Sequence, residues 1–151
     1  MGKGLKHNKT LAVLMVFLLL LTSLTVLGPA ASAQAAGGIH YVRQGAAGDG
    51  SSWADAYGSL PAALNRGDTY YIADGVYAGY SFNTAEEGTT PITIKKATVA
   101  DHGSGIGWND AYGDGQAEFD GMLEFTTSYW VFDGGTGGGA GQWNTGFGFK
   151  I

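Results

Sequence analysis

A glycine-rich stretch in the second half of the chain concentrates acidic side chains. They are Asp101, Asp110, Asp114 and Glu118. Calcium binds several carboxylate and carbonyl oxygens, and acidic loops commonly supply them. The order Asp110-x-Tyr112-x-Asp114-Gly115 is similar to the start of an EF-hand loop, but Tyr112 and Gly121 occupy two ligand positions. We expect Asp101, Asp110 and Asp114 to be candidate Ca2+ ligands, and solvated turn acids are the alternative interpretation.

Aromatic side chains are frequent in the same region and beyond it. Trp108, Tyr112 and Trp143 lie in glycine-rich segments, where exposed rings could stack on sugar rings. This interpretation predicts a surface that binds a saccharide substrate. Large rings also bury much apolar area, so packing against the protein interior is the alternative.

Few other side chains suggest catalysis. Lys95 and Lys96 are adjacent, and either could accept a proton if its pKa were depressed. A charged strand end that discourages edge pairing is the simpler interpretation. Asp120 and Asp133 each precede a glycine, which is typical of a turn. The histidines and serines form no arrangement that is typical of nucleophilic catalysis.

Two segments of the sequence are similar to each other. Residues 48–58 read GDGSSWADAYG and residues 103–113 read GSGIGWNDAYG, with seven identical positions. The first precedes a predicted helix and the second precedes predicted strands. We therefore expect similar turn chemistry in two structural contexts, because glycine permits positive φ and Asp binds nearby backbone amides.

The N-terminal segment 1–33 has the features of a secretory signal peptide. Three lysines precede an apolar run over residues 11–27, and Ala31-Ser-Ala33 supplies a cleavage site. An uncleaved membrane anchor is the alternative, since the run is close to the ~18 residues that allow a spanning helix. We expect cleavage after Ala33 and a secreted protein, extracellular or at the cell surface.

Composition narrows the class of partner. The chain has a formal net charge of −5, and residues 34–151 carry five basic and thirteen acidic side chains. Phosphate binding needs clustered lysine and arginine, so a nucleic-acid partner is not expected. An acidic polymer is also repelled unless cations bridge it to the protein. The sequence has no cysteine, so the fold depends on its core or on metals. We expect a monomer.

Short apolar segments separated by glycines predict strands. We expect them at residues 39–42, 68–73, 80–82, 91–96, 117–119, 122–125 and 129–132. One helix is expected within residues 53–66, with Ser59 as its N-cap and Leu60 and Leu64 on its apolar face. Residues 147–151 alternate like a strand, and a chain that stops there is expected to be a fragment.

The spacing of the strands predicts how they assemble. Apolar strand residues follow one another at similar intervals along the chain, at Ile72, Ile94, Phe119 and Phe149. Strands that recur in this way, with no helices between them, are typical of coils stacked along an axis. Each coil would add parallel strands to neighbouring sheets, and the helix would cover one end of the stack.

Six segments together carry a resemblance to a known superfamily. They are Tyr41-Val42, GDGSSW (48–53), LPAAL (60–64), GDTYYIA (67–73), GVY (75–77) and PITIK (91–95). In this combination the chain resembles the N-terminal region of secreted bacterial proteins of the pectate-lyase-like superfamily. The resemblance covers roughly residues 40–134. It implies an all-β fold: a right-handed parallel β-helix over residues 34–151 with a short N-terminal capping α-helix, truncated at its C-terminus.

The resemblance also implies a carbohydrate-active protein. Polysaccharide lyases, some glycoside hydrolases and non-catalytic surface proteins share this fold. A lyase acting on an acidic glycan such as pectate is the leading expectation, and a glycan- or protein-binding module is the alternative. β-Elimination needs a base and a cation, often calcium, that neutralises the uronate carboxylate. No motif of this sequence carries a family active site, so we assign no catalytic residue and expect the fragment to be inactive.

Overall fold

The described part of the chain is built from two parallel β-sheets. A computed structural model describes residues 37–135 and 146–151; the predicted signal peptide and Trp143 lie outside these ranges. The first sheet contains β1 (Ile39–Val42), β2 (Thr69–Ile72), β4 (Ile92–Lys96) and β6 (Trp130–Asp133). The second contains β3 (Gly75–Phe82), β5 (Ala117–Phe125) and β7 (Phe149–Lys150). Every paired strand is parallel to its neighbour, so the prediction of an all-β fold with parallel strands is confirmed for these residues.

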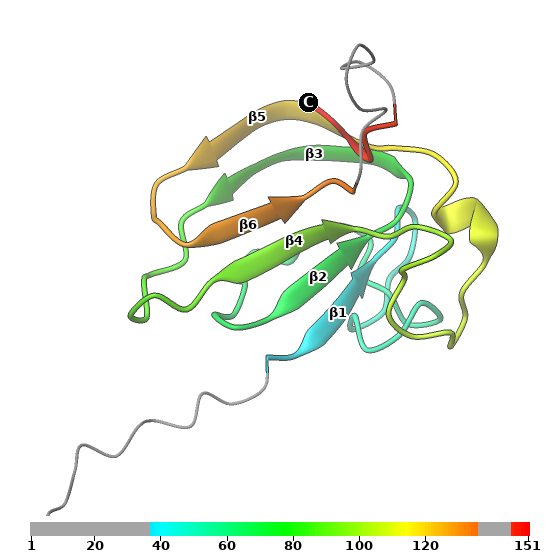
Figure 1. The fold of residues 1–151 in the computed structure, drawn as a ribbon, viewed down its shortest axis with the longest axis horizontal. Helices are drawn as coiled ribbons and strands as arrows, with labels where there is room; N and C mark the ends of the chain where they lie inside the picture. Colours follow the sequence, from blue (N-terminus) through cyan, green and yellow to red (C-terminus); the bar gives the residue numbers. More distant parts are fainter. Residues whose placement is uncertain (1–36, 136–145) are drawn as a thin grey trace, which may run out of the picture. The chain divides into compact units, whose positions relative to one another are not determined.

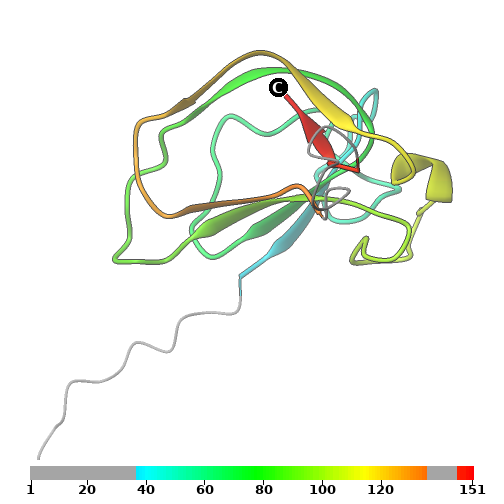
Figure 2. The same cartoon turned by 45° about the horizontal axis from the view of Figure 1, so that its top comes forward.

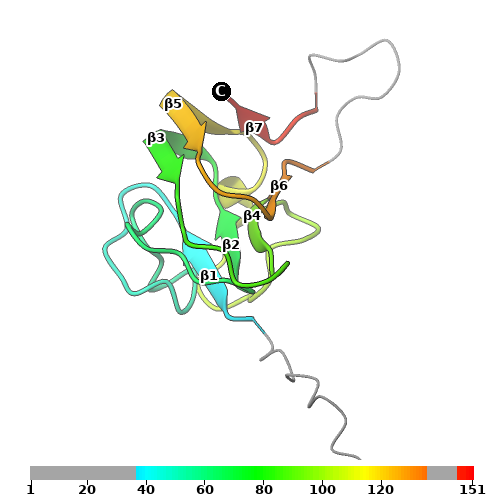
Figure 3. The ribbon, with the colours of Figure 1, turned by 90° about the vertical axis from the view of Figure 1, so that its left-hand side faces the viewer.

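The chain alternates between the two sheets after β2. From β2 onward, each strand pairs with the strand two places later in the sequence, so that β2 pairs with β4 and β3 with β5. Figure 1 shows β1, β2, β4 and β6 side by side and pointing the same way. Figure 2 shows β3 and β5 arching on the other side of the interior, and Figure 3 shows β7 beside β5.

The lengths of chain between paired strands differ from the predicted period. Thr69 of β2 pairs with Thr93 of β4, whereas Thr93 pairs with Val131 of β6, which lies much further along the sequence. Long loops, such as residues 97–116, separate some strands and not others. A constant number of residues per coil therefore does not predict which residues pair. The loops between strands differ in length, while the strands still pair in parallel.

The intervals through Ile72, Ile94, Phe119 and Phe149 cross from the first sheet to the second. Ile94 pairs with Tyr70 instead of Ile72, and Phe119 and Phe149 lie in the second sheet. These intervals mix both sheets because inward-facing apolar residues of either sheet look the same in the sequence. The interior does contain these side chains, with Ile72 and Ile94 fully buried.

Residues 59–66 form bends and irregular backbone, so the predicted capping α-helix is wrong. The Asn65 N–H donates to the Tyr70 hydroxyl (3.1 Å), and the Pro61 carbonyl accepts from the Tyr80 hydroxyl (2.8 Å). In an α-helix these two backbone groups would bond to each other. A helix this short is also marginal by itself. Leu60 and Leu64 are nevertheless buried in the core cluster, so the segment contributes to the core without helical backbone.

The one helix in the described ranges is a short 3-10 turn, η1 (Asp110–Tyr112). It ends the second of the two similar segments, residues 103–113. In the first segment, Tyr57 instead forms an isolated parallel bridge with Val42. The two segments thus have different backbones despite their similar sequences. Within residues 37–135 and 146–151, no helix has the length and apolar character needed to cross a membrane.

Candidate functional site

Strands β4 and β6 end side by side, and oppositely charged residues face each other near these ends. Lys95 of β4 pairs in register with Asp133 of β6. A cavity of about 370 Å³ beyond them is lined by Lys95, Lys96, Thr98, Asp101, Asp133 and Gly135. A second cavity of about 510 Å³ shares Lys96, Thr98 and Gly135 with the first. We call the two adjoining cavities the β4–β6 groove.

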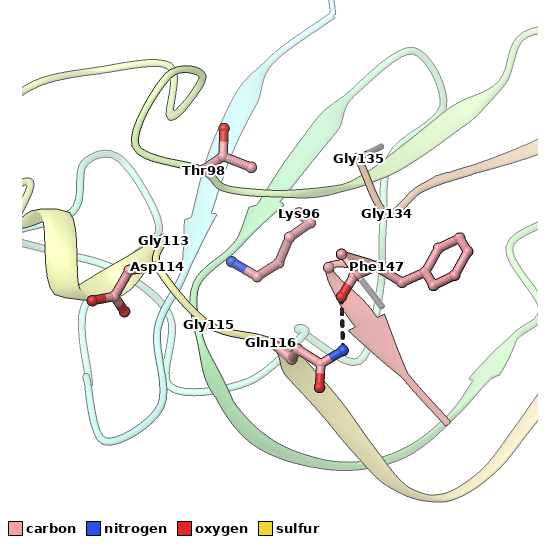
Figure 4. Close-up of a pocket in the computed structure, with 11 residues that line it drawn as sticks. Lys96, Thr98, Gly113, Asp114, Gly115, Gln116, Gly134, Gly135 and Phe147 are labelled. Atoms are coloured by element: carbon pink, nitrogen blue, oxygen red, sulfur yellow. Dashed lines mark hydrogen bonds between the residues drawn. The ribbon is translucent and has the colours of Figure 1, made fainter. Parts of the chain in front are cut away.

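Glycines make up much of the wall of the larger cavity. Six glycines line it, together with Thr98, Asp114, Gln116 and Phe147 beside Lys96, as Figure 4 shows. A Cβ added at Gly148 would lie 2.4 Å from the Gly134 carbonyl oxygen and 2.4 Å from Lys96 Cγ. The Gln116 side-chain amide donates to the Phe147 carbonyl (2.7 Å) and joins two walls of the cavity. The lining is therefore mostly backbone and short polar side chains.

The floor of the groove contains a buried ion pair. The Lys96 side chain is 1% exposed, and its ammonium lies 2.6 Å from Asp74 Oδ1. The ammonium also donates to the Ala97 carbonyl, and the Gly115 N–H donates to Asp74 Oδ2 (2.6 Å). A buried charge is costly unless it is paired and hydrogen-bonded, and both partners meet this condition. The pair fixes the loop at Gly115 against the end of β4.

A second network lies at the more exposed side of the groove. Lys95 Nζ is 2.7 Å from Asp101 Oδ2 and 3.7 Å from Asp133 Oδ2, and it lies 5.6 Å from the centre of the Tyr71 ring. The Tyr71 hydroxyl donates to Asp101 (2.9 Å). The hydrogen bond with Asp101 raises the pKa of Lys95, and the same bond lowers the pKa of Asp101. Burial, followed by the bond to Asp101, raises the pKa of Tyr71.

These shifts bear on the predicted role of Lys95 as a base. A proton acceptor must be unprotonated near neutral pH, which requires a depressed lysine pKa. Because Asp101 holds Lys95 in its charged form, Lys95 is suited to donating hydrogen bonds in this arrangement. Asp133 ends β6 and accepts from the Gly135 N–H (3.1 Å), as expected for an Asp-Gly turn. Asp120, in contrast, lies inside β5, so the turn predicted there is wrong.

The three candidate calcium ligands occupy different surroundings. Asp101 binds Lys95 and Tyr71, Asp114 lines the larger cavity, and Asp110 accepts from the Trp108 indole N–H (2.9 Å). Among the described residues, no group of three or more His, Asp or Glu side chains is placed to hold a metal ion. A calcium site at these residues stays a prediction, and it would require Asp101 to release Lys95.

The candidate sugar-stacking aromatics pack against other side chains. The Trp108 ring is stacked on His102 (centroids 4.2 Å apart) and lies 5.0 Å from the Trp53 ring. The Arg43 guanidinium lies 5.0 Å from the centre of the Tyr112 ring. Trp108 and Tyr112 pack against a cluster with fully buried Trp53. His102 covers one face of the Trp108 ring, so a sugar could stack on that face only by displacing it. The saccharide role of Trp108, Tyr112 and Trp143 stays a prediction.

Sequence reasoning missed the role of Lys96, although the sequence contains the signal. Ile92, Ile94 and Lys96 alternate along one strand, so all three side chains point to the same face. Their burial follows that alternation. A lysine on an inward face needs a buried carboxylate, and Asp74 is the acid that follows the neighbouring strand β2. Thr98 and Gln116 have no comparable signal, because loop geometry brings them to the groove.

Comparisons with known proteins do not assign a family or a function to the chain. No family model matches the chain, and neither a curated protein nor a solved structure shows a significant match to it.

Proposed function

We propose that this chain is a secreted right-handed parallel β-helix protein of the pectate-lyase-like superfamily that binds polysaccharide in the β4–β6 groove. The alternation of the chain between two parallel sheets supports the β-helix interpretation. The features of residues 1–33 support secretion or a cell-surface location. We keep the expectation of a monomer as part of this proposal.

The composition of the groove carries the functional part of the proposal. Its cavities, about 370 and 510 Å³, fall in the range of about 300–1,000 Å³ that is typical of ligand sites. Their lining combines hydrogen-bond donors and acceptors within a short distance of each other: an ammonium, carboxylates, a hydroxyl and glycine backbone. Sugar hydroxyl groups both donate and accept hydrogen bonds, so this lining offers partners for them.

Polysaccharide lyase activity is the second candidate. The observation in its favour is that Lys95 and Lys96 bring two ammonium groups to one groove, where they could neutralise a uronate carboxylate. Both ammonium groups already have carboxylate partners, and the pKa of Lys95 is raised by Asp101. The geometry therefore favours binding over proton abstraction in this groove. In the lyase proposal, calcium at Asp101, Asp110 and Asp114 would be the additional cation.

Binding is tested with the full chain and a matched pair of glycine variants. Gly135 lines both cavities at φ +77°, and Gly45 has φ +78°; a Cβ at either position meets nothing within 4 Å. Gly135→Asn should weaken retardation in polysaccharide-containing gels, whereas Gly45→Asn should leave it unchanged. Equal behaviour of both variants, or no retardation of the wild type by any polysaccharide, would refute the groove as a glycan site.

Lyase activity is tested separately on pectate, alginate and glycosaminoglycans. β-Elimination leaves an unsaturated product that absorbs at roughly 230–240 nm. Turnover by the full chain that is lost in Lys95→Met would favour the lyase.

A further inference from the structure

We infer that the β4–β6 groove selects uncharged, hydroxyl-rich glycans and discriminates against polyuronates. This inference rests on the proposed function and specifies its substrate class. It differs from the acidic substrate that the superfamily resemblance implies, and it follows from the charges that line the groove.

The accessible charges of the groove are predominantly negative. Asp101, Asp114 and Asp133 line it, and the side chains of Asp101 and Asp133 are 50% and 44% exposed. Lys95 is the accessible cation at 27%, because Lys96 is 1% exposed and neutralised by Asp74. Three carboxylates thus face one available ammonium. A uronate carboxylate entering the groove would be repelled at short range.

The one accessible ammonium is already engaged by two carboxylates. Asp101 and Asp133 lie 2.7 and 3.7 Å from Lys95 Nζ, and the Tyr71 ring lies on another side. A uronate would have to replace Asp101, which is also held by the Tyr71 hydroxyl. A sugar hydroxyl can bind without replacing Asp101. It can donate to a free carboxylate lone pair and accept from the ammonium while the ion pairs stay intact.

The net charge of the whole chain also disfavours binding of a polyuronate. The formal net charge is −5, so a polyanion is repelled before it reaches the groove, and the repulsion weakens as salt screens it. An uncharged glycan is insensitive to this field. The sign of the salt dependence therefore distinguishes the two substrate classes without any variant.

The first experiment measures the affinity of the full chain for soluble β-glucan, which is uncharged, and for polygalacturonate or alginate, which are polyuronates. A chelator is present so that calcium cannot bridge carboxylates. We expect binding of the neutral glycan to change little with salt. Polyuronate binding should be at least about tenfold weaker at low salt, because like charges meet in the groove, and should strengthen as salt increases.

A charge-reversal variant tests whether the groove itself sets this preference. Asp133→Lys should improve polyuronate affinity relative to neutral glycan by about tenfold, since a repulsive carboxylate becomes an attractive ammonium. Asp120→Lys is the matched control, because Asp120 is exposed on β5, outside the groove lining, and gives the same change in net charge. It should change the ratio by less than about twofold.

The outcomes separate this inference from the proposed function. Wild-type protein that binds polyuronate as tightly as neutral glycan, with affinity that falls as salt rises, overturns the inference and leaves glycan binding intact. Equal effects of Asp133→Lys and Asp120→Lys also overturn it. Absence of binding to every glycan overturns the proposed function. The wild-type salt series decides between these outcomes even if Asp133→Lys does not fold.

Discussion

Trp53 and Trp108 occupy the same position in the two similar segments of the sequence, and their rings lie 5.0 Å apart in the folded chain. The backbones meet as well. The Trp53 N–H donates to the Ile106 carbonyl (3.1 Å), and the Trp53 indole donates to the His102 carbonyl (2.9 Å). At Gly107, an added Cβ would lie 2.4 Å from the Ala54 nitrogen. Two loops far apart in the sequence thus form one aromatic cluster that covers the outer side of the first sheet.

The cluster predicts unequal costs for removing its two tryptophans. Trp53 is fully buried and Trp108 is half-buried, so Trp53→Ala should lower the free energy of unfolding by about 3–5 kcal/mol and Trp108→Ala by less. The double variant should lose less than the sum, with a coupling of about 0.5–1.5 kcal/mol for the ring pair. Urea unfolding followed by circular dichroism measures all four proteins. Strict additivity would show that the ring contact contributes nothing.

Arg66 is a second residue whose replacement should strongly lower the free energy of unfolding. Its guanidinium donates to the carbonyls of Thr84 (2.6 Å), Ala85 (3.0 Å), Ser128 (2.9 Å) and Tyr129 (3.0 Å), and lies 4.8 Å from the centre of the Trp130 ring. It therefore ties together three segments that are distant in the sequence. The hydrogen bond from Arg66 to the Tyr129 carbonyl also helps to hold Tyr129 at φ +62°, a conformation that non-glycine residues rarely adopt.

A lysine cannot replace this arrangement. Arg66→Lys keeps the charge but loses the planar set of donors, so we expect a loss of about 2–4 kcal/mol in the free energy of unfolding. Lys150→Met, which removes an exposed lysine paired with Glu118, should cost within about 0.5 kcal/mol. Chemical denaturation compares the two. A cost for Arg66→Lys as small as that for Lys150→Met would contradict the role assigned to the guanidinium.

The strands of the first sheet could be read from the sequence, whereas the bounds of β3 and β5 and the long-range partners could not. β3 begins at Gly75, before the predicted strand at residues 80–82, and β5 runs through the predicted break between residues 119 and 122. The alternation of Ile92 and Ile94 predicts β4 correctly because its inward face is uniformly apolar until Lys96. Residues 60–64 also look helical by spacing, yet Tyr70 and Tyr80 bind the backbone groups that a helix would use. Those hydroxyls belong to the later strands β2 and β3, and no pattern within residues 60–64 predicts that they bind there. The groove was missed for the same reason, since loops of unequal length bring its walls together.

Buried tyrosines predict a loss of stability in strong alkali. Burial raises the pKa of Tyr77 to about 12, and its hydroxyl donates to the Ala73 carbonyl (3.0 Å). Burial also raises the pKa of Tyr70 to about 12. The folded state thus keeps protons that the unfolded chain loses near pH 10. The stabilisation is fully present below pH 10 and declines as the pH rises towards 12.

Spectroscopic titration of tyrosine checks this sign. Part of the phenolate absorbance should develop only near pH 12 or together with unfolding. Tyr77→Phe should flatten the fall in the free energy of unfolding between pH 10 and 12, because one group with different folded and unfolded pKa values is removed. Tyr129→Phe, at a residue that is 42% exposed, serves as the comparison. If the free energy of unfolding falls equally between pH 10 and 12 in wild type and Tyr77→Phe, the raised pKa of Tyr77 does not cause the alkaline loss of stability.

The buried pair of Lys96 and Asp74 predicts a characteristic pattern of single and double variants. Lys96→Met keeps most of the side-chain volume but leaves the Asp74 carboxylate without its ammonium 2.6 Å away. Breaking a buried pair from one side costs about 3–5 kcal/mol, because the remaining charge is uncompensated. Lys96→Met with Asp74→Asn removes both charges, and the Asn amide can still accept from the Gly115 N–H. The double variant should therefore be more stable than Lys96→Met alone. Thermal unfolding at neutral pH ranks the three proteins. A double variant that is less stable than Lys96→Met would mean that Asp74 depends on contacts other than the lysine for its place beside the groove.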